Sequence, residues 1–209
     1  MSITSPYHQY NLRRNPFGEL ARQERAELAV VELDGWLNFL NHDRAVLQFI
    51  GPCGYGKTTH LLAIQVALES AEYVYLPEAR PRPRVGEQRP MIVDEAQRLS
   101  FWQLRKILKI GGPLVFGTHN DLTTAVRRAK LEVKTIDVAA DLSTERLEKI
   151  LNRRIESSRL ADGTIPRITT DHALWLQQQF GQNVRAIEHF LYDQFQRCAS
   201  EKNSWPPAS

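Results

Sequence analysis

The sequence predicts an α/β fold in which a mostly parallel, five-stranded sheet is followed by a small all-helical region. Three observations support this prediction. A glycine-rich stretch at residues 51–58 lies between a short apolar segment and a helical pattern. Helical patterns separate several of the short apolar segments, as in sheets built from parallel strands. After residue 140 the strand-like segments stop, and only helical patterns follow.

Length and composition exclude several classes of protein. The chain has 209 residues, enough for one large domain or one domain with a small addition. Apolar residues make up 42% and charged residues 24%, which argues against wholesale disorder. No apolar run is long enough to span a bilayer, and the first residues lack a secretion-signal pattern. The two cysteines, Cys53 and Cys198, cannot form a disulfide framework. We therefore expect a cytoplasmic protein without membrane association.

The first expected element is a helix at residues 19–40, because Leu33, Trp36, Leu37 and Leu40 fall on one face. Five short segments that are rich in β-forming residues and bounded by Gly or Pro are expected to be buried strands. These segments are residues 46–50, 72–76, 91–93, 113–116 and 133–138. Their apolar character on both faces is typical of a sheet that is covered by helices on two sides.

Three helices are expected after the sheet. Ser143 is a candidate N-cap for the first of them, and Gly181 ends the second. The three helical segments are residues 144–160, 171–180 and 183–197. We therefore divide the chain into a core with an N-terminal linker and helix, residues 1–140, and a helical lid with a loose C-terminal tail, residues 141–209.

Residues 79–90 are compositionally biased, because prolines alternate with arginines along the first half of this segment. The prolines disfavour a helix and favour an extended path. Four arginines against one glutamate make the segment positively charged; they are Arg80, Arg82, Arg84 and Arg89. Contact with DNA phosphates is one interpretation, and it predicts a log–log salt slope of about −3 to −4 per chain. The alternative is a solvated connection that has no partner.

Residues 51–58, Gly-Pro-Cys-Gly-Tyr-Gly-Lys-Thr, match the pattern G-x-x-x-x-G-K-[ST] at each fixed position. Glycines let backbone N–H groups surround a phosphate, and the following helix adds the positive end of its dipole. Lys57 is the candidate partner of the β- and γ-phosphates of ATP, and Thr58 is a candidate ligand of Mg²⁺. The candidate nucleotide-contacting residues are Gly51, Pro52, Cys53, Gly54, Tyr55, Gly56, Lys57, Thr58 and Thr59.

Asp94 and Glu95 directly follow the expected strand at residues 91–93. A carboxylate at the end of a buried strand can lie beside the metal of a nucleotide site, which is the role expected of Asp94. Glu95 is the candidate catalytic residue that orients and polarises a water molecule. The alternative interpretation, an acidic pair that caps the next helix, is less consistent with a phosphate loop upstream.

Together these motifs resemble the AAA+ ATPases, whose P-loop fold joins a parallel sheet to a helical lid. The most similar branch contains the transposition-regulator ATPases and the ATPase of the general secretion pathway. Three stretches carry the resemblance: Tyr-Asn-Leu-Arg-Arg-Asn-Pro-Phe at residues 10–17, Asp-Glu-Ala-Gln at residues 94–97, and Gly-Gln-Asn-Val-Arg at residues 181–185. The resemblance covers nearly the whole chain.

The resemblance implies further roles for polar residues outside the phosphate loop. Thr118, at the end of the fourth expected strand, would be the sensor 1 group, with His119 as a substitute. Arg185 would be the sensor 2 arginine that reaches the nucleotide from the lid. The alternatives are an ordinary strand-end residue for Thr118 and a solvated arginine for Arg185.

The same resemblance assigns the adenine side to Asn15, Pro16 and Phe17, although Phe17 could equally be a hydrophobic staple for the following helix. An arginine finger, which completes the site of a neighbouring subunit, would come from Arg127 or Arg128. The arginine that the resemblance places just before the fifth strand is absent from this sequence.

The sequence therefore predicts an ATP-binding and ATP-hydrolysing, Mg²⁺-dependent AAA+ protein. Its nucleotide state would control assembly into a homo-oligomer and engagement of a partner, either DNA or a protein. A nucleotide-gated scaffold with little turnover is an alternative, because the finger residues are unclear. A small P-loop nucleotide kinase is a further alternative, but its closing lid would be inserted into the core rather than appended to it.

Overall fold

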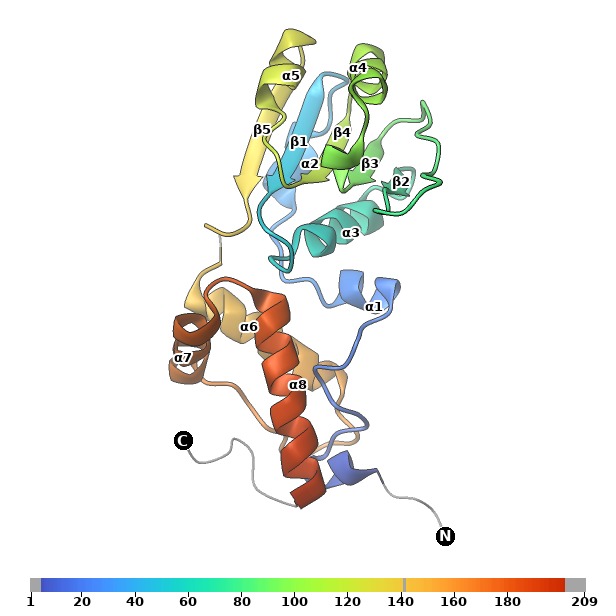
Figure 1. Cartoon of the computed structure of the whole chain (residues 1–209). Coiled ribbons are helices and arrows are strands. Elements are labelled where there is room, and N and C mark those ends of the chain that lie inside the picture. The colour runs from blue at the N-terminus through green and yellow to red at the C-terminus, as the bar shows by residue number, and fades with distance from the viewer. Residues whose placement is uncertain (1–4, 141, 202–209) are drawn as a thin grey trace. The chain divides into compact units, whose positions relative to one another are not determined.

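The computed structural model describes residues 5–140 and 142–201. These residues form two compact units, which Figure 1 shows in chain colours. The sheet unit comprises residues 25–140, and the helical unit comprises residues 5–24 together with 142–201. Each unit has its own hydrophobic core, and each is described by itself below.

The sheet has five strands, all parallel, in the order β2-β3-β4-β1-β5. The strands are β1 Ala45–Ile50, β2 Glu72–Tyr75, β3 Met91–Asp94, β4 Leu114–Thr118 and β5 Glu132–Asp137. This arrangement confirms the predicted fold class. Because all strands run the same way, the ends of β1, β3 and β4 meet at one edge, where Ile50 pairs with Thr118 and Asp94 with Gly117.

Helices cover both faces of this sheet. Side chains alternate along β1: Leu47 and Phe49 lie in one cluster with Trp36 and Leu61, whereas Val46 lies in another. The first cluster takes in α2 Asp34–Phe39 and α3 Lys57–Ala67; the second takes in α4 Phe101–Ile110 and α5 Thr123–Arg128. This two-sided burial explains why β1, β3 and β4 are apolar along most of their length, whereas the edge strand β5, which was expected to be buried, is largely exposed.

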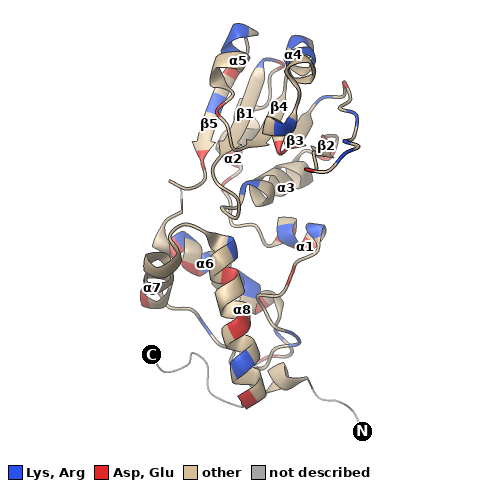
Figure 2. Cartoon of the chain, viewed as in Figure 1, with Lys and Arg blue, Asp and Glu red and all other residues tan. Residues whose placement is uncertain are grey.

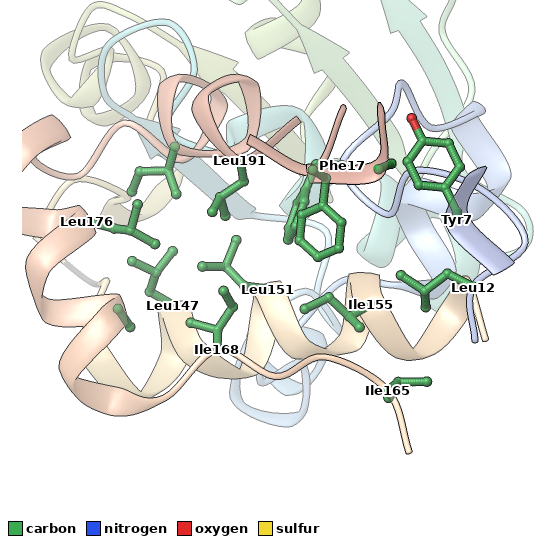
Figure 3. Packing of buried hydrophobic residues seen from close by; sticks show 14 of the residues in the cluster. Tyr7, Leu12, Phe17, Leu147, Leu151, Ile155, Ile165, Ile168, Leu176 and Leu191 are labelled. Carbon is green, nitrogen blue, oxygen red and sulfur yellow. The ribbon is translucent and has the colours of Figure 1, made fainter. Parts of the chain in front are cut away.

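The helical unit contains α6 Thr144–Ser157, α7 Thr170–Phe180 and α8 Val184–Glu201, close to the expected bounds. Ser143 caps α6 by accepting a hydrogen bond from the Arg146 N–H, and Gly181 ends α7 with a φ of 61°. Figure 3 shows the core of this unit, in which Leu151 and Leu191 are fully buried. Within the described part of the chain, no helix combines the length and the apolar character that a membrane span requires.

The N-terminal segment, which the sequence analysis assigned to the sheet domain, packs into the helical unit instead. Leu12 and Phe17 lie in its core, and the Phe17 ring contacts Phe195 with centroids 5.5 Å apart. The buried Arg154 guanidinium donates to the Pro16 carbonyl at 2.9 Å and pairs with Glu188 at 3.0 Å. The segment therefore contributes both apolar surface and hydrogen bonds to the helical unit.

The prediction of a single helix at residues 19–40 is wrong. The structure has two short helices, α1 Arg22–Glu27 and α2, separated by residues 28–33. The β-branched pair Val30 and Val31 lies in this break, and β-branched side chains lose rotamer freedom in a helix. The apolar face from which the helix was predicted packs into the core only along α2, where Trp36 is buried.

The segment between β2 and β3 is extended, as its prolines predict. Arg89 is anchored to α4: its Nε donates to the Gly111 carbonyl at 2.7 Å and its Nη2 to the Ile107 carbonyl at 3.1 Å. Arg82 donates to the Arg98 carbonyl. Arg80 and Arg84 are exposed. Two of the four arginines therefore hold the segment in place, which leaves two exposed arginines for phosphate contact instead of the three or four expected from the sequence.

Candidate nucleotide site

The phosphate loop connects β1 to α3, and its backbone requires glycine at three positions. Gly54 and Gly56 have φ values of 90° and 91°, a conformation that L side chains rarely adopt. A Cβ at Gly51 would lie 2.7 Å from a methyl group of Val138. Because Gly56 at the N-cap has no side chain, it cannot accept a hydrogen bond from the first N–H groups of α3. The loop and helix end are thus suited to an external anion.

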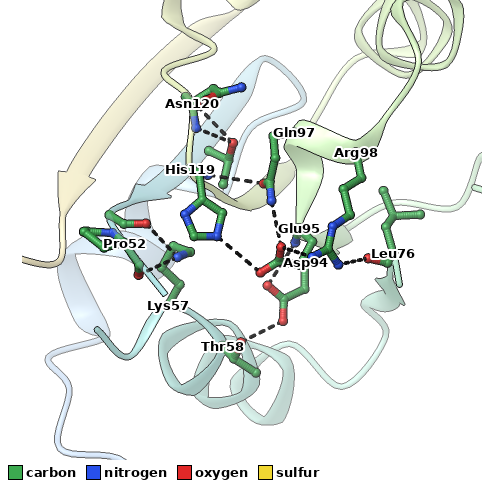
Figure 4. A network of polar contacts seen from close by, with 12 residues as sticks. Pro52, Lys57, Thr58, Leu76, Asp94, Glu95, Gln97, Arg98, His119 and Asn120 are labelled. Atoms are coloured by element: carbon green, nitrogen blue, oxygen red, sulfur yellow. Dashed lines mark hydrogen bonds and ion pairs between the residues drawn. The ribbon is translucent and has the colours of Figure 1, made fainter. Parts of the chain in front are cut away.

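Lys57 begins α3 with its side chain folded into the loop, as Figure 4 shows. Its Nζ donates to the carbonyl of Gly51 at 2.7 Å and to that of Pro52 at 2.9 Å. The residue is only 5% exposed. Backbone carbonyls of the loop therefore hold a positive charge where an anion can be neutralised.

Thr58 and Asp94 bring two oxygen ligands together. The Thr58 hydroxyl donates to Asp94 Oδ2 at 2.9 Å, and the Tyr73 hydroxyl donates to the same oxygen at 2.9 Å. A hydroxyl beside a carboxylate fits Mg²⁺, which commonly takes one or two protein oxygens plus substrate phosphates. Within residues 5–140 and 142–201, no cluster of three His, Cys, Asp or Glu side chains could hold a metal ion. A Mg²⁺ ion bound by Thr58 and Asp94 would complete its coordination with water molecules or with phosphate oxygens.

Two residues that support Asp94 were not foreseen from the sequence. Tyr73 supplies the hydroxyl from β2, the strand next to β3. Gly117 on β4 leaves room for the carboxylate, because a Cβ there would lie 2.8 Å from Asp94 Oδ1 and 2.7 Å from Leu61 Cδ1. Strand register pairs Gly117 with Asp94 and so leaves this space beside the carboxylate. The role of Gly117 therefore could not be predicted without the strand register.

Burial shapes the charge state of Asp94, which is 1% exposed. Desolvation raises the pKa of Asp94 above its usual range, and the hydrogen bonds from Thr58 and Tyr73 oppose this rise only in part. In the unfolded chain the carboxyl ionises at its usual pH. At a pH between the pKa of Asp94 in the unfolded chain and its higher pKa in the folded protein, folding takes up a proton. The free energy of unfolding of the metal-free protein therefore decreases as the pH rises through this interval.

Replacement of Asp94 by asparagine is expected to raise the Tm of the metal-free protein at neutral pH, because the buried charge is removed. The same variant is expected to lose Mg²⁺-dependent ATP binding, because an amide is a poor substitute for a carboxylate ligand. Melting curves in EDTA from about pH 4 to about pH 8 check the first effect, and calorimetry with Mg·ATP checks the second. An Asp94→Asn protein that melts below the wild type at neutral pH would contradict the argument.

Glu95 follows Asp94 with a left-handed backbone, φ 63° and ψ 42°. Its Oε2 accepts a hydrogen bond from Gln97 Nε2 at 2.7 Å and pairs with Arg98 Nη2 at 3.1 Å. Its Oε1 lies 3.7 Å from His119 Nε2, beyond hydrogen-bond distance. The carboxylate is therefore held through one oxygen, and Oε1 is the oxygen that can orient a water molecule (Figure 4).

At the end of β4 the structure brings His119, rather than Thr118, to Glu95. The buried Thr118 hydroxyl is engaged in its own turn, donating to the Asn120 carbonyl at 3.0 Å and accepting from the Asn120 N–H at 3.1 Å. The His119 N–H donates to Gln97 Oε1 at 3.2 Å, which links the end of β4 to the segment after β3. His119 is thus the residue of this turn that contacts the carboxylate network.

Arg127 and Arg128 lie in the last turn of α5 and are exposed. The opposite end of α5 is fixed by Gln48, a buried residue of β1 that sequence reasoning missed. Gln48 Nε2 donates to Asp121 Oδ1 at 2.7 Å and to Thr123 Oγ1 at 2.8 Å. The two arginines are therefore presented on the surface by a helix whose start is anchored to the sheet.

The remaining predicted site residues, Asn15, Pro16, Phe17 and Arg185, belong to the helical unit. Asn15 Nδ2 donates to the Tyr192 carbonyl at 3.0 Å, and Asn15 Oδ1 accepts from the Phe17 N–H at 3.1 Å. The Pro16 carbonyl accepts from a buried arginine, as described above. Arg185 is exposed in the first turn of α8. The contacts of Asn15, Pro16 and Phe17 are structural within their unit.

No protein-family model matches the chain, and no curated protein matches its sequence. Solved structures do match. Cdc6p from Pyrobaculum aerophilum aligns with a TM-score of 0.53 and 16% identity, over 94% of this chain and 67% of that chain. The Thermotoga maritima RuvB Holliday junction branch migration motor aligns with a TM-score of 0.51 and 17% identity, over 89% and 64%. A mutant form of the same RuvB aligns with a TM-score of 0.52 and 16% identity, over 89% of this chain and 65% of that chain.

At this level of identity the likeness shows the fold alone, and that fold agrees with the parallel-sheet P-loop fold expected from the sequence. The chain spans about two thirds of the length of these structures. The AAA+ class is thereby supported. Membership of the branch that contains the transposition regulators and the secretion ATPase stays a prediction.

Proposed function

We propose that the chain binds and hydrolyses ATP, and that its nucleotide state controls self-assembly and engagement of DNA. The observation that carries this proposal is the Thr58–Asp94 hydrogen bond beside the phosphate loop. This hydrogen bond supports the proposal because the two oxygens expected to bind Mg²⁺ lie together at the start of the helix that follows the glycines and contains the lysine expected to bind phosphate. The AAA+ fold of the structural neighbours supports the same conclusion.

The proposed mechanism consists of positioning and charge neutralisation. Lys57 and the N–H groups of the loop would bind the phosphates, and Thr58 and Asp94 would hold Mg²⁺, which would supply neutralisation of phosphate charge. Glu95 orients a water molecule through Oε1 and accepts its proton. Arg98 and Gln97 hold Glu95 Oε2 and so fix the direction in which the other oxygen points.

Phosphate release tests this proposal against its alternatives. We expect release with ATP and Mg²⁺, and an increase when DNA is added. Release that instead requires a small phosphate acceptor would indicate a kinase. Tight ATP binding with negligible release under all conditions would favour the nucleotide-gated scaffold, for which the supporting observation is that Arg98 and Gln97 already engage one oxygen of Glu95.

Self-assembly is expected to depend on ATP, because a site that uses a neighbour's arginine is complete only at an interface. Replacing Arg127 and Arg128 by alanine should reduce turnover by about tenfold or more, since a charge-assisted contact is lost, and should leave ATP affinity unchanged. Light scattering with a non-hydrolysable ATP analogue measures the assembly. Lys130→Ala, an exposed cation two residues beyond α5, is the matched control. A strictly monomeric protein with full activity would rule out the shared site.

Engagement of DNA is proposed through Arg80 and Arg84, the two exposed arginines of the extended segment. Such a segment can contact phosphates but carries no recognition helix, so binding would be nearly independent of sequence. Two phosphate contacts per chain predict a log–log salt slope of about −2 on duplex DNA, half of what four arginines would give. An oligomer would repeat these contacts and bind more tightly than one chain.

A further inference from the structure

Helix α4 exposes two large aromatic side chains that the proposed ATP site does not use. Phe101 is 69% exposed and Trp102 is 72% exposed. Their ring centroids lie 5.4 Å apart with an interplanar angle of 77°. A reciprocal capping box between Ser100 and Gln103 fixes the turn that carries them. The aromatic pair is thus held edge to face on an ordered helix end, with most of the surface of both side chains exposed.

The exposed face of α4 continues as a row of cations. Apart from Ile110 at the end of the helix, its exposed residues are Phe101, Trp102, Arg105, Lys106 and Lys109, which follow helical spacing; we call these five the α4 stripe. Ile107 and Leu108 on the other face are buried in the core of the sheet unit. The helix contains no acidic residue. The α4 stripe therefore combines aromatic rings at one end with positive charge along the rest.

The neighbouring segment between β2 and β3 adds to this charge. Arg89 anchors the segment to α4, and Glu87 pairs with Lys106 at 2.9 Å. Glu87 forms an ion pair with Lys106 and so neutralises its charge. Arg105 and Lys109 therefore supply the positive charge of the α4 stripe to an external partner. The exposed Arg80 and Arg84 lie on the same segment. Figure 2 shows basic residues both on α4 and along this segment.

We infer that the α4 stripe binds single-stranded nucleic acid, with unpaired bases stacked on Phe101 and Trp102 and phosphates contacting Arg105 and Lys109. Positive charge next to aromatic rings is the combination that such strands require, because each base has a face to stack and each nucleotide has a phosphate. A duplex hides its base faces and would leave the rings unused. The eight-residue step from Phe101 to Lys109 spans about 12 Å along the helix, the length of a few nucleotides at most.

This inference deepens the proposed engagement of DNA and rests on that part of the proposed function, not on hydrolysis. Strand binding by α4 needs no nucleotide in the phosphate loop, so it can be measured without ATP. An acidic protein partner is the competing occupant of the α4 stripe. It would depend on apolar contact at position 102 rather than on an aromatic face, and this difference separates the two occupants.

The test measures fluorescence anisotropy of a labelled 20-nucleotide oligo(dT) and of a hairpin duplex of equal length, with the full chain in the absence of ATP. We expect the single strand to bind more tightly than the duplex. Trp102→Ala should weaken strand binding by about tenfold with an unchanged salt slope, since one stacked base is lost. Trp102→Phe should retain binding, and Trp102→Leu should behave like alanine because leucine has no aromatic face.

The cationic half of the stripe is tested by its salt dependence. Arg105→Ser together with Lys109→Ser should reduce the log–log slope by about 1.4, because each phosphate contact to a single strand contributes about 0.7. Trp175→Ala, a 42% exposed tryptophan of the helical unit, is the matched control and should not alter binding. Since the substituted side chains are exposed, melting temperatures should stay close to that of the wild type.

Several results would overturn the inference. They are a preference for the duplex, full strand affinity in Trp102→Ala, full strand affinity in Trp102→Leu, and no strand binding by the wild type at low salt. Phosphate release from ATP, measured on the same preparations, separates this failure from failure of the proposed ATPase. Active hydrolysis without strand binding would refute the stripe alone, and strand binding without hydrolysis would refute the ATPase alone.

Discussion

Replacement of Lys57 by alanine is expected to weaken ATP binding by at least about 100-fold while leaving the fold intact. The ammonium is almost wholly buried against the loop, so its loss removes a desolvated positive charge from the phosphate position. Its Nζ donates to the carbonyls of Gly51 and Pro52 within the loop, and its replacement is expected to leave the hydrophobic cores unchanged. Calorimetric titration with Mg·ATP measures the affinity.

Lys134→Ala is the matched control for this experiment, because Lys134 is an exposed lysine on the edge strand β5. It should bind ATP as the wild type does. A Lys57→Ala protein that melts normally and binds ATP with wild-type affinity would show that the phosphate loop is not the ATP site. It would also refute the assignment of Thr58 and Asp94 as Mg²⁺ ligands.

Replacement of Glu95 by glutamine is expected to reduce turnover by about 10²-fold or more, because the amide cannot accept a proton from water. ATP binding should be retained, since Thr58 and Asp94 are unchanged. The variant should also accumulate any ATP-dependent oligomer, which light scattering would detect. Glutamine can still meet Gln97 and Arg98 through its carbonyl oxygen, so the end of β3 is expected to keep its conformation.

Phosphate release under saturating ATP measures the effect. Glu132→Gln, an exposed carboxylate of β5, is the control and should turn over normally. Unchanged release in Glu95→Gln would reassign Glu95 to a structural role at the end of β3, in which its pairing with Arg98 orders the turn before α4.

The phosphate loop and the Asp94–Glu95 pair could be predicted because local rules determine them. Gly54 and Gly56 occupy backbone conformations that other residues rarely adopt, and the sequence shows those glycines directly. Parallel strands bring their carboxyl ends to one edge, so a phosphate loop after β1 and a carboxylate after β3 are expected to meet. The Thr58–Asp94 hydrogen bond is the observed outcome of that expectation.

The partners of these residues could not be predicted, because they depend on strand register and on side-chain packing between distant elements. Tyr73 reaches Asp94 only because β2 lies beside β3 in parallel register. Gln97 and Arg98 meet Glu95 because the chain turns with a left-handed residue directly after β3. Arg89 lies in a segment whose composition suggests DNA contacts. Its hydrogen bonds to the Ile107 and Gly111 carbonyls show that it holds the segment against α4 instead.

The helix expected at residues 19–40 and the place of the N-terminal segment were missed for a related reason. Helical periodicity was inferred across residues 28–33, where the local preference of Val30 and Val31 is against a helix. Phe17 and Leu12 are apolar residues without a periodic pattern, so the sequence does not show which core takes them. Long-range packing into the helical unit decides their position.

Equilibrium binding of ATP to the purified full chain, with Mg²⁺ and with EDTA, tests the central claim most directly, because the claim is that Thr58 and Asp94 form a metal–nucleotide site beside the phosphate loop. The account predicts one ATP per chain and a clearly higher affinity in Mg²⁺ than in EDTA. The absence of ATP binding, or an affinity that does not change when Mg²⁺ is removed, would contradict it.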